Sequence, residues 1–210
     1  MNLILTGLES SECRAWTTFL GDLDNVSIYE GSILDTKSDA IVSPANSFGF
    51  MDGGIDGLYL KHFGKELQQR VQKLIQDKHN GELLVGSADI VETGNNTHPF
   101  LIVAPTMRVP MKLADSVNPY LAARAIFLLL KNGIFQEGEL VGKKISDTVK
   151  TIALPGLCTG VGGISFNTCA RQVRAAYDDF VLGKRQTPRT WAEASEQHQL
   201  LFTDRPKRLQ

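Results

Sequence analysis

Short apolar runs alternate with longer segments of helical character along this chain, and that alternation restricts the fold more than any other feature. The runs read LILT, VSIYEG, AIVS, ADIVET, FLIVAP and KTIALPG in chain order. Each is rich in β-branched or aliphatic residues, as β-strands are. Chains in which strands alternate with helices fold into layered α/β structures. We therefore predict an α/β fold whose first strand is the run LILT.

The first clearly amphipathic segment follows Asp56. Its apolar residues recur every three or four positions, so a helix would gather them on one face and lay that face on the sheet. They are Phe63, Leu67, Val71, Leu74 and Ile75. The turn signal HNG at residues 79–81 predicts that this helix ends there.

Two further helices have recognisable end signals. In NPYLAARAIFLLLKNG, Asn118 is a candidate N-cap, Pro119 suits the first turn, and Gly133 marks the end. In SFNTCARQVRAAYDDFVLG, either Ser165 or Asn167 is a candidate N-cap. This last helix directly follows a glycine-rich stretch, LPGLCTGVGG.

Length and composition favour one domain with a C-terminal addition. At about 150 residues per domain, the 210 residues suffice for one domain and a short extension. We place the domain over residues 1–183. Residues 184–210 are predicted to be a polar appendage, because they carry two prolines and basic residues near the end. Leu200, Leu201 and Phe202 are expected to hold it against the domain.

The charge balance argues against nucleic acid or an anionic membrane as a partner. The 22 basic and 23 acidic side chains give a formal charge of −1, and no basic stripe with interleaved aromatic residues is present. A nucleic-acid-binding module is therefore the least favoured function. No run of about eighteen apolar residues exists to span a bilayer. The N-terminus lacks the basic start and cleavage pattern of a signal peptide, so we expect a cytoplasmic protein.

The cysteines and histidines give no sign of a disulfide framework or a metal site. Cys13, Cys158 and Cys169 are odd in number and lack CxxC spacing, which suits a reducing compartment. Cys158 lies beside the glycine-rich stretch, where it is either a nucleophile or, more commonly, a small buried residue. The four histidines form no i,i+4 pair, so no metal and no cofactor are expected.

Two glycine-bearing loops are the candidate binding elements. Residues 44–56, PANSFGFMDGGID, and residues 154–165, LPGLCTGVGGIS, each follow an apolar strand and lead into a predicted helix. This arrangement directs backbone N–H groups and a helix N-terminus at an anion, and two such loops suit a diphosphate. For either loop alone, glycines that only form turns are the simpler interpretation. No lysine follows in Walker A order and no G-x-G-x-x-G opens the first βα turn, which disfavours P-loop hydrolysis and ordinary dinucleotide binding.

Four stretches resemble, in order, the macrodomain family, whose members bind ADP-ribose. GSILDTKSDAIVSPAN at 31–46 resembles the family's GDIT…DAIVNAAN motif, and GGIDG at 53–57 resembles the GGVDG of its hydrolase branch. LIVAPTMR at 101–108 is similar to VIHTVGPTWR, and IALPGLCTGVGG at 152–163 is similar to AFPAISTGVYG. The resemblance implies a macrodomain-like mixed β-sheet sandwiched between helix layers, a three-layer α/β/α fold, with the ligand in a crevice at the strand ends.

The resemblance also implies positions for ADP-ribose. Asn46 and Asp56 would lie at the distal ribose as the catalytic residues, and Ser32 and Ile33 would face the adenine. Further ligand-binding positions are implied at Ala45, Gly53, Gly54, Ile55, Thr159, Gly160, Val161, Gly162 and Gly163. From the residues alone, Asp56 is also suited to capping its helix, and Asn46 to bonding its own loop.

Three positions depart from the family pattern. Ser32 stands where the usual Asp accepts a hydrogen bond from the adenine amino group, and a hydroxyl is a weaker acceptor. Gly162 replaces the Phe or Tyr that packs on the distal ribose in many hydrolytic members, a role that Phe48 or Phe50 could take. Gly53 replaces a lysine used by a second hydrolase branch, which acts on ADP-ribosylated guanine or glutamate. That lysine mechanism therefore does not apply.

These features favour an enzyme over a reader module. The favoured function is hydrolysis at the distal ribose, in mono-ADP-ribosylated acidic side chains or O-acetyl-ADP-ribose, with a modified nucleobase as a further substrate class. As a carboxylate departs from the ribose, water needs positioning more than strong deprotonation, which is a task for Asp56 and Asn46. The alternative is a non-catalytic ADP-ribose reader. Asp56 argues against it, because a carboxylate near a diphosphate adds nothing to binding.

Overall fold

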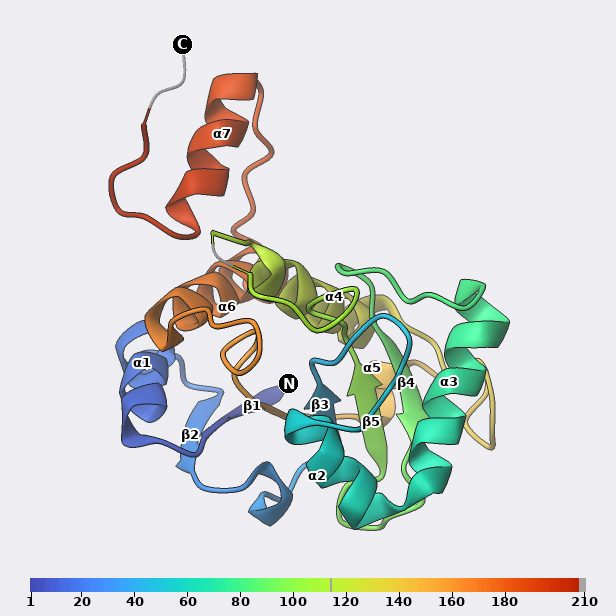
Figure 1. Ribbon diagram of the computed structural model, residues 1–210. Helices are drawn as coiled ribbons and strands as arrows, with labels where there is room; N and C mark the ends of the chain where they lie inside the picture. The colour runs from blue at the N-terminus through green and yellow to red at the C-terminus, as the bar shows by residue number, and fades with distance from the viewer. Residues whose placement is uncertain (114, 208–210) are drawn as a thin grey trace.

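All six predicted strands are present and lie in one mixed sheet (Figure 1). The computed structural model describes residues 1–113 and 115–207. The strands are β1 (Asn2–Gly7), β2 (Val26–Glu30), β3 (Ala40–Ser43), β4 (Asp89–Glu92), β5 (Phe100–Val103) and β6 (Thr151–Leu154). Their order is β2-β1-β6-β3-β5-β4, in which β4 is antiparallel to β5 and the other pairs are parallel. The carboxyl ends of the parallel strands therefore meet at one edge of the sheet.

The central strands are buried on both faces. Along β3, Ala40 and Val42 belong to one hydrophobic core and Ile41 to another. Along β6, Ile152 and Ala153 are divided in the same way. Because successive side chains of a strand point to opposite faces, the sheet separates the interior into two cores. Strands with this double burial read as continuous apolar runs, as they do in this sequence.

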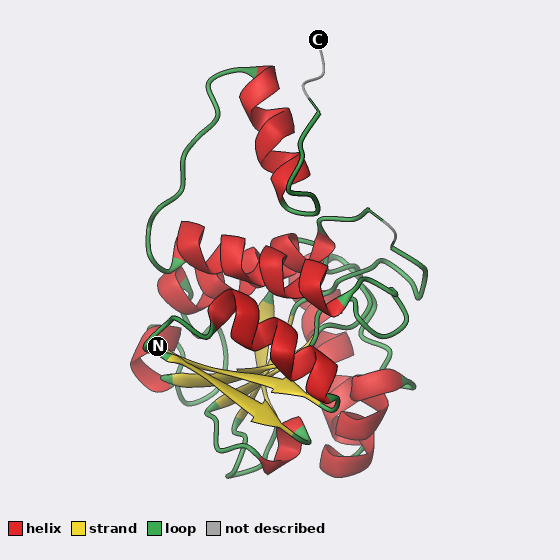
Figure 2. Ribbon diagram, turned by 90° about the vertical axis from the view of Figure 1, so that its left-hand side faces the viewer, coloured by secondary structure: helices red, strands yellow, loops and turns green. Residues whose placement is uncertain are grey.

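Helices cover both faces of the sheet, which gives three layers (Figures 1 and 2). They are α1 (Ser10–Leu20), α2 (Gly54–Phe63), α3 (Lys65–His79), α4 (Asn118–Asn132), α5 (Ile145–Thr148), α6 (Phe166–Phe180), α7 (Trp191–Leu200) and the 3-10 helix η1 (Ile33–Asp35). Helices α1, α4 and α6 pack together over the core that contains Val42. Helices α2 and α3 pack over the core that contains Ile41. This is the predicted mixed sheet between helix layers.

The single helix predicted to end near residues 79–81 is in fact two helices. Helix α2 ends and α3 begins at Gly64, whose φ of 86° lies in the left-handed region that favours glycine. The predicted apolar face is present in α3, where Leu67 and Val71 are buried. The end signal is confirmed, because α3 stops at His79 and is followed by Asn80 in the left-handed conformation.

The prediction that Asn118 caps α4 is wrong. The N-cap position is Val117, and the Nδ2 of Asn118 donates to the carbonyl oxygen of Thr106 at 2.7 Å. This bond ties α4 to the loop that follows β5. For α6 the N-cap is Ser165, whose Oγ accepts a backbone N–H of the first turn at 3.1 Å, and not Asn167.

Helix α1 lies in a segment for which we predict no helix from the sequence. Its buried residues Cys13, Trp16 and Leu20 have helical spacing, but the pattern is short. Trp16 is fully buried and its Nε1 donates to the carbonyl oxygen of Thr6 at 3.2 Å. This bond fixes α1 against β1, close to the edge where the parallel strands end.

The segment after α6 stands apart from the layers (Figures 1 and 2). Helix α7 has no buried residue, and Leu200 is 44% exposed, so the expected anchoring by this residue is weak. Phe202 packs edge-on against His198 within the same segment. An ion pair between Arg171 and Asp204 joins the segment to α6. The domain boundary at residue 183 stays a prediction, and residues 208–210 of the predicted appendage lie outside the described residues.

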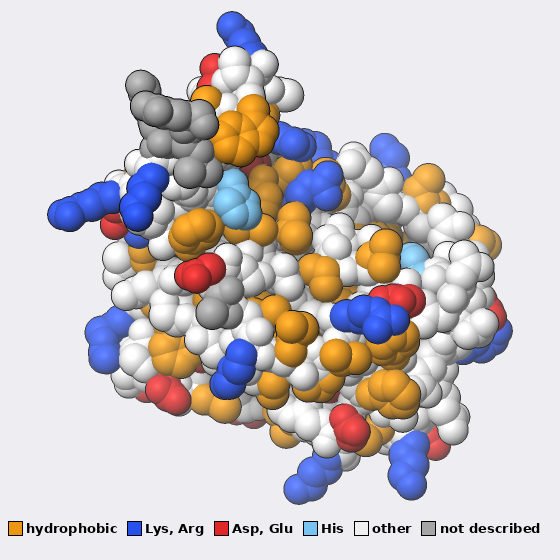
Figure 3. Space-filling model, turned by 45° about the horizontal axis from the view of Figure 1, so that its top comes forward, with side chains coloured by type: hydrophobic (Ala, Val, Ile, Leu, Met, Phe, Trp, Pro, Cys, Tyr) orange, Lys and Arg blue, Asp and Glu red, His pale blue; other side chains and the backbone are white. Residues whose placement is uncertain are grey.

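Surface charge follows the balance of the sequence. On the face shown in Figure 3, basic and acidic side chains are interspersed rather than gathered by sign. Across residues 1–113 and 115–207, no helix is both long enough and apolar enough to cross a bilayer.

Candidate functional site

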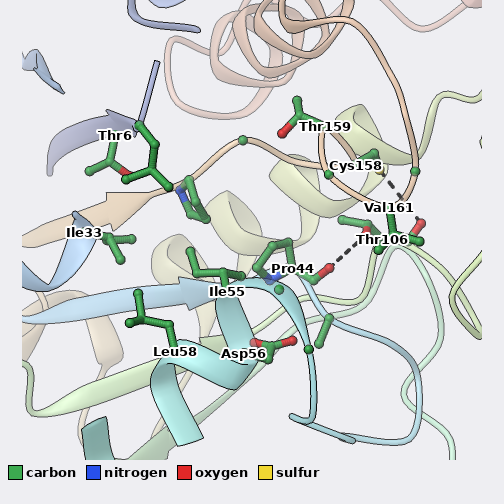
Figure 4. Close-up of a pocket in the computed structure, with 18 of the residues that line it drawn as sticks. Thr6, Ile33, Pro44, Ile55, Asp56, Leu58, Thr106, Cys158, Thr159 and Val161 are labelled. Atoms are coloured by element: carbon green, nitrogen blue, oxygen red, sulfur yellow. Dashed lines mark hydrogen bonds between the residues drawn. The ribbon is translucent and has the colours of Figure 1, made fainter. Parts of the chain in front are cut away.

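A cavity of about 550 Å³ opens at the carboxyl ends of the parallel strands. Its walls come from the loops that follow β1, β2, β3, β5 and β6. In Figure 4, Thr6 and Ile33 lie on one side of this cavity, Cys158 and Val161 lie on the other, and Pro44 lies between them. Open α/β sheets bind their ligands at this edge, so the cavity is the candidate site.

The structure brings the predicted site residues together, with one exception. Those that line the cavity are Ser32, Ile33, Ala45, Asn46, Gly53, Gly54, Ile55, Asp56, Thr159, Gly160, Val161 and Gly162. Gly163 does not line it and faces Lys112, whose Nζ would lie 3.3 Å from a Cβ at this position. Two loops that are about a hundred residues apart in sequence thus meet in one cavity, as loops at one edge of an open α/β sheet do. The contacts of these residues with a ligand stay predictions.

Asn46 holds the shape of its own loop. Its Oδ1 accepts the backbone N–H groups of Phe48 at 3.1 Å and Phe50 at 3.3 Å. Its Nδ2 donates to the carbonyl oxygen of Phe50 at 2.8 Å. Three bonds from one amide fix the turn over residues 46–50. Asn46 is half-buried and also lines the cavity, so the same side chain shapes the wall of the site.

Asp56 lines the cavity and does not cap its helix. It is the third residue of α2, whose N-cap is Gly53 and has no side-chain hydrogen bond. The side chain is 6% exposed, and the Oγ of Ser43 donates to its Oδ1 at 2.6 Å. Burial raises the pKa of Asp56 to about 7, opposed by the Ser43 hydrogen bond and helped by nearby Asp52. The carboxyl therefore changes charge near neutral pH.

The loop between β6 and α6 is closed tightly on itself. The N–H of Gly163 donates to the carbonyl oxygen of Gly160 at 3.1 Å, and that of Ile164 to Cys158 at 3.1 Å. A Cβ at Gly162 would lie 2.5 Å from the carbonyl oxygen of Cys158. No side chain fits there on this backbone, which explains the absence of an aromatic ring at position 162. A Cβ at Gly160 would meet nothing within 4 Å, so this glycine faces open space.

Cys158 is a buried residue and not an activated nucleophile. Burial raises the pKa of its thiol to about 12, against the opposing effect of its contact with Thr106. The thiol is therefore protonated at neutral pH and unreactive. The φ of Cys158 is 63°, a left-handed conformation that non-glycine residues rarely adopt, so its role is in the shape of the loop.

The other end of the cavity forms where β2 ends. The Oγ of Ser32 accepts a backbone N–H at 3.3 Å and so begins η1, while Ile33 is buried beneath the cavity. Phe50 lines the cavity and is 54% exposed. Phe48 lies outside the lining and stacks under Arg108, whose guanidinium is 5.0 Å from the ring centre. Of the two phenylalanines, only Phe50 is therefore placed to pack on a ligand.

Comparison with known proteins identifies the family. The family model described as Macro domain matches residues 42–173. The chain belongs to the Macro domain family. Macro domain-containing protein TTE0995 of Caldanaerobacter subterraneus subsp. tengcongensis is 28% identical over 190 residues, which are 87% of this chain and 91% of that protein. An uncharacterized protein of Aquifex aeolicus is 29% identical over 147 residues, 70% of this chain and 77% of that protein.

Solved macrodomains share this fold. The macrodomain of Mycobacterium tuberculosis DarG has a TM-score of 0.57 at 18% identity and covers 72% of this chain and 88% of its own. A mutant Oceanobacillus iheyensis macrodomain solved with ADPR has a TM-score of 0.57 at 21% identity, with 72% and 75% covered. Thermosipho africanus DarTG in complex with ADP-ribose has a TM-score of 0.53 at 16% identity, with 76% and 39% covered.

Several residues of the macrodomain cavity are absent from the sequence prediction. They include Thr6, Gly7, Leu8, Glu12, Leu58, Thr106, Met107, Pro110 and Gly156. They come one or a few at a time from different loops, so no local spacing marks them. For Glu12 the available signal is the helical spacing of its neighbours Cys13 and Trp16, which would have placed it in the first turn of a helix after β1.

Glu12 is the second buried carboxyl of the cavity. Its side chain is 9% exposed. Burial raises the pKa of Glu12 to about 7, against the opposing effect of the Leu8 backbone N–H, and Glu9 adds to the increase. The site therefore holds two carboxylic acids, Glu12 and Asp56, that titrate near neutral pH.

The arrangement suits an extended anionic ligand. The loop over residues 158–163 presents backbone groups at the N-terminus of α6, where an anion is favoured. Apolar side chains such as Ile33 and Ile55 form much of the wall. Within the described ranges, no group of three or more His, Cys, Asp or Glu side chains is arranged to hold a metal ion.

Proposed function

We propose that this macrodomain binds ADP-ribose and hydrolyses the bond to the anomeric carbon of its distal ribose. The substrates are mono-ADP-ribosylated acidic side chains or a small ester such as O-acetyl-ADP-ribose. One observation carries the proposal: a single cavity joins the glycine-rich loop before α6 to Asp56, a buried carboxyl whose pKa is raised to about 7. Groups with this property at a cavity wall are typical of acid–base sites.

The ligand would cross the cavity from β2 to β3. Its adenine would lie against Ile33, and its diphosphate would rest on the loop at Gly160. Its distal ribose would lie over Gly53 and Gly54, where a Cβ would meet nothing within 4 Å. The relatives solved with ADPR or ADP-ribose support this choice of ligand.

The proposed hydrolysis needs a water molecule beside the distal ribose. The water oxygen attacks the anomeric carbon, the carbon–oxygen bond to the leaving carboxylate breaks with its electron pair, and Asp56 takes the water proton. Ser43 holds Oδ1 of Asp56 at 2.6 Å, which leaves Oδ2 for the water. Positive charge develops on the sugar, so an ionised Asp56 also stabilises the transition state.

Calorimetry with free ADP-ribose tests the binding half of the proposal. We expect a measurable heat and a raised thermal midpoint, because a ligand that binds only the folded state stabilises it. NAD should bind more weakly, since its nicotinamide would crowd the wall at Asp56. The absence of any heat at millimolar ADP-ribose would refute the proposal.

A reader without catalysis is the second candidate. The observation that favours it is the commitment of the Asn46 amide to its own loop, which leaves fewer groups to orient a substrate. Release of ADP-ribose from ester-linked protein and from O-acetyl-ADP-ribose separates the two. Tight binding without release from either substrate would establish the reader.

A further inference from the structure

Glu12 is a buried acid that the proposed hydrolysis leaves without a role. It lies in the first turn of α1, is 9% exposed, and lines the cavity beside the ends of β1 and β6. The backbone N–H of Leu8 donates to its carboxyl and opposes the rise in its pKa. A carboxyl at this depth needs hydrogen-bond donors, and a ligand in the cavity can supply them.

The surrounding backbone is shaped around this carboxyl. A Cβ at Gly156 would lie 2.2 Å from Oε1 of Glu12, and a Cβ at Gly7 would lie 3.0 Å from Oε2. Glycines therefore flank the acid at the end of β1 and in the loop after β6, and an alanine at position 156 would displace it. The Oγ1 of Thr159 would lie 2.3 Å from the same Cβ at position 156, so the missing side chain leaves room for both polar groups.

The strand order places Glu12 between two parts of the ligand. The loops of the cavity follow the row β2, β1, β6, β3. In the proposed binding mode the adenine lies after β2 at Ile33, and the diphosphate lies after β6 at Gly160. The ribose that joins adenine to diphosphate must then lie over the end of β1, next to Glu12.

Resting on the proposed function, we infer that Glu12 binds the hydroxyl groups of the ribose next to adenine and makes the site specific for an unmodified 2′-hydroxyl. A ribose presents two adjacent hydroxyl donors, and a carboxyl with two oxygens matches them. Acidic residues at other nucleotide sites bind ribose hydroxyls in this way and exclude a 2′-phosphate. At this depth a 2′-phosphate would meet both the volume and the negative charge of Glu12.

The experiment compares three ligands on the wild-type protein by calorimetry. They are ADP-ribose, 2′-deoxy-ADP-ribose and 2′-phospho-ADP-ribose. Loss of a hydrogen bond to a buried acid predicts about tenfold weaker binding of the 2′-deoxy ligand, and the 2′-phosphate predicts a loss of at least about tenfold. Equal affinity for all three would overturn this inference and leave the proposed function intact. Failure to bind any of the three would overturn both.

Variants test whether Glu12 causes the preference for ADP-ribose over the 2′-phospho ligand. Glu12→Gln keeps the shape and removes the charge, so the preference for ADP-ribose over the 2′-phospho ligand should fall by about tenfold. Glu9→Gln is the matched control, because Glu9 is an exposed acid at the N-cap of α1 that lies outside the cavity lining. An unchanged preference in folded Glu12→Gln would contradict the inference. If that variant does not fold, the wild-type series still decides.

Discussion

The two glycine-rich loops at the cavity differ in the groups that hold their shape, although each contains a glycine that faces open space. In the loop over residues 44–56, Gly53 and Gly54 face open space. In the loop over residues 154–165, Gly162 is pressed against the backbone of its own loop. The first loop is held in shape by a side chain, Asn46, and the second by backbone contacts.

This difference suits the two loops to different tasks, the binding of an anion and the chemistry at a sugar. Backbone contacts make the second loop rigid, and a rigid array of N–H groups binds an anion without an ordering cost. The first loop has open glycines and ends at Asp56, so in the proposed binding mode it accommodates the distal ribose and supplies the reacting carboxylate. Substitutions in the second loop should therefore act on binding, and those in the first on turnover.

The largest expected effect is on ADP-ribose affinity, from a substitution in the loop proposed to bind the diphosphate. Gly160→Glu should reduce ADP-ribose affinity by at least about a hundredfold, or roughly 2.7 kcal/mol, because a negative side chain would occupy the proposed path of the diphosphate. Calorimetry measures the loss. The thermal midpoint should stay unchanged, since a Cβ at Gly160 meets nothing within 4 Å.

Two alanine variants sharpen this test. Gly160→Ala should bind and fold as the wild type does, whereas Gly162→Ala should lower the thermal midpoint because its Cβ would lie 2.5 Å from the Cys158 carbonyl oxygen. If both alanines behave alike, the two glycines are not in different environments. If Gly160→Glu binds normally, the loop is only a turn.

The second effect is on turnover at the end of the first loop. Asp56→Asn should slow ADP-ribose release from an ester-linked substrate by about a hundredfold, as loss of a general base does. Affinity for ADP-ribose should stay within about tenfold. Since Asp56 makes no N-cap bond, its removal does not uncap α2.

Ser43→Ala provides the control for this variant. It removes the hydrogen bond that opposes the raised pKa of Asp56, so the midpoint of the pH–rate profile should move upward. In the wild type the rate should rise with pH through about 7, where Asp56 ionises. A rate that is indifferent to pH and to Asp56→Asn would remove Asp56 from the mechanism.

Much of the fold could be predicted from the sequence because the local residue patterns agree with the burial of each element. Strands such as β3 are apolar on both faces, so their runs stand out without any periodicity. The break at Gly64 was missed because the apolar spacing continues through it from Phe63 to Leu67. The wrong cap at Asn118 arose because its side chain bonds a distant loop, a tertiary contact that no local pattern reveals.

The sequence predicted residues of the candidate site only where a recognisable motif forms one of the loops at the cavity. The predicted residues of the two glycine loops line the cavity with the exception of Gly163, whereas Glu12 comes from helix α1, for which no prediction was made. The space for its carboxyl depends on Gly7 at the end of β1 and on Gly156 in the loop after β6. The strand order brings these glycines and Glu12 together, so no single segment of the sequence reveals this space.

The third prediction concerns how pH alters stability on the two sides of the cavity. In the folded chain the pKa of Asp56 is about 7, against an ordinary value of 3.8, so the folded state binds more protons than the unfolded state between these values. The free energy of unfolding should therefore fall as pH rises from about 4 to about 7, by at most about 1.4 kcal/mol per pH unit for each such carboxyl.

Urea denaturation between about pH 5 and about pH 8 measures this slope. Asp56→Asn and Glu12→Gln should each reduce the dependence of the free energy of unfolding on pH. Asp56 lies at the end of the loop over residues 44–56, and Glu12 lies beside the loop over residues 154–165. A slope that neither variant changes would show that these carboxyls are not the buried groups that titrate.

The smallest expected effect is at Asn46, the side chain that holds the first loop. Asn46→Ala removes three hydrogen bonds to the turn over residues 46–50, so ADP-ribose affinity and turnover should both fall by about tenfold. Hydrogen exchange at the N–H groups of Phe48 and Phe50 should become faster, because both lose their acceptor. Asn46→Asp keeps that acceptor and should protect both N–H groups while losing only the bond to the Phe50 carbonyl. A large loss of turnover with unchanged exchange would mean that Asn46 contacts the reacting sugar directly, and the first loop would then owe its shape to its neighbours and not to this amide.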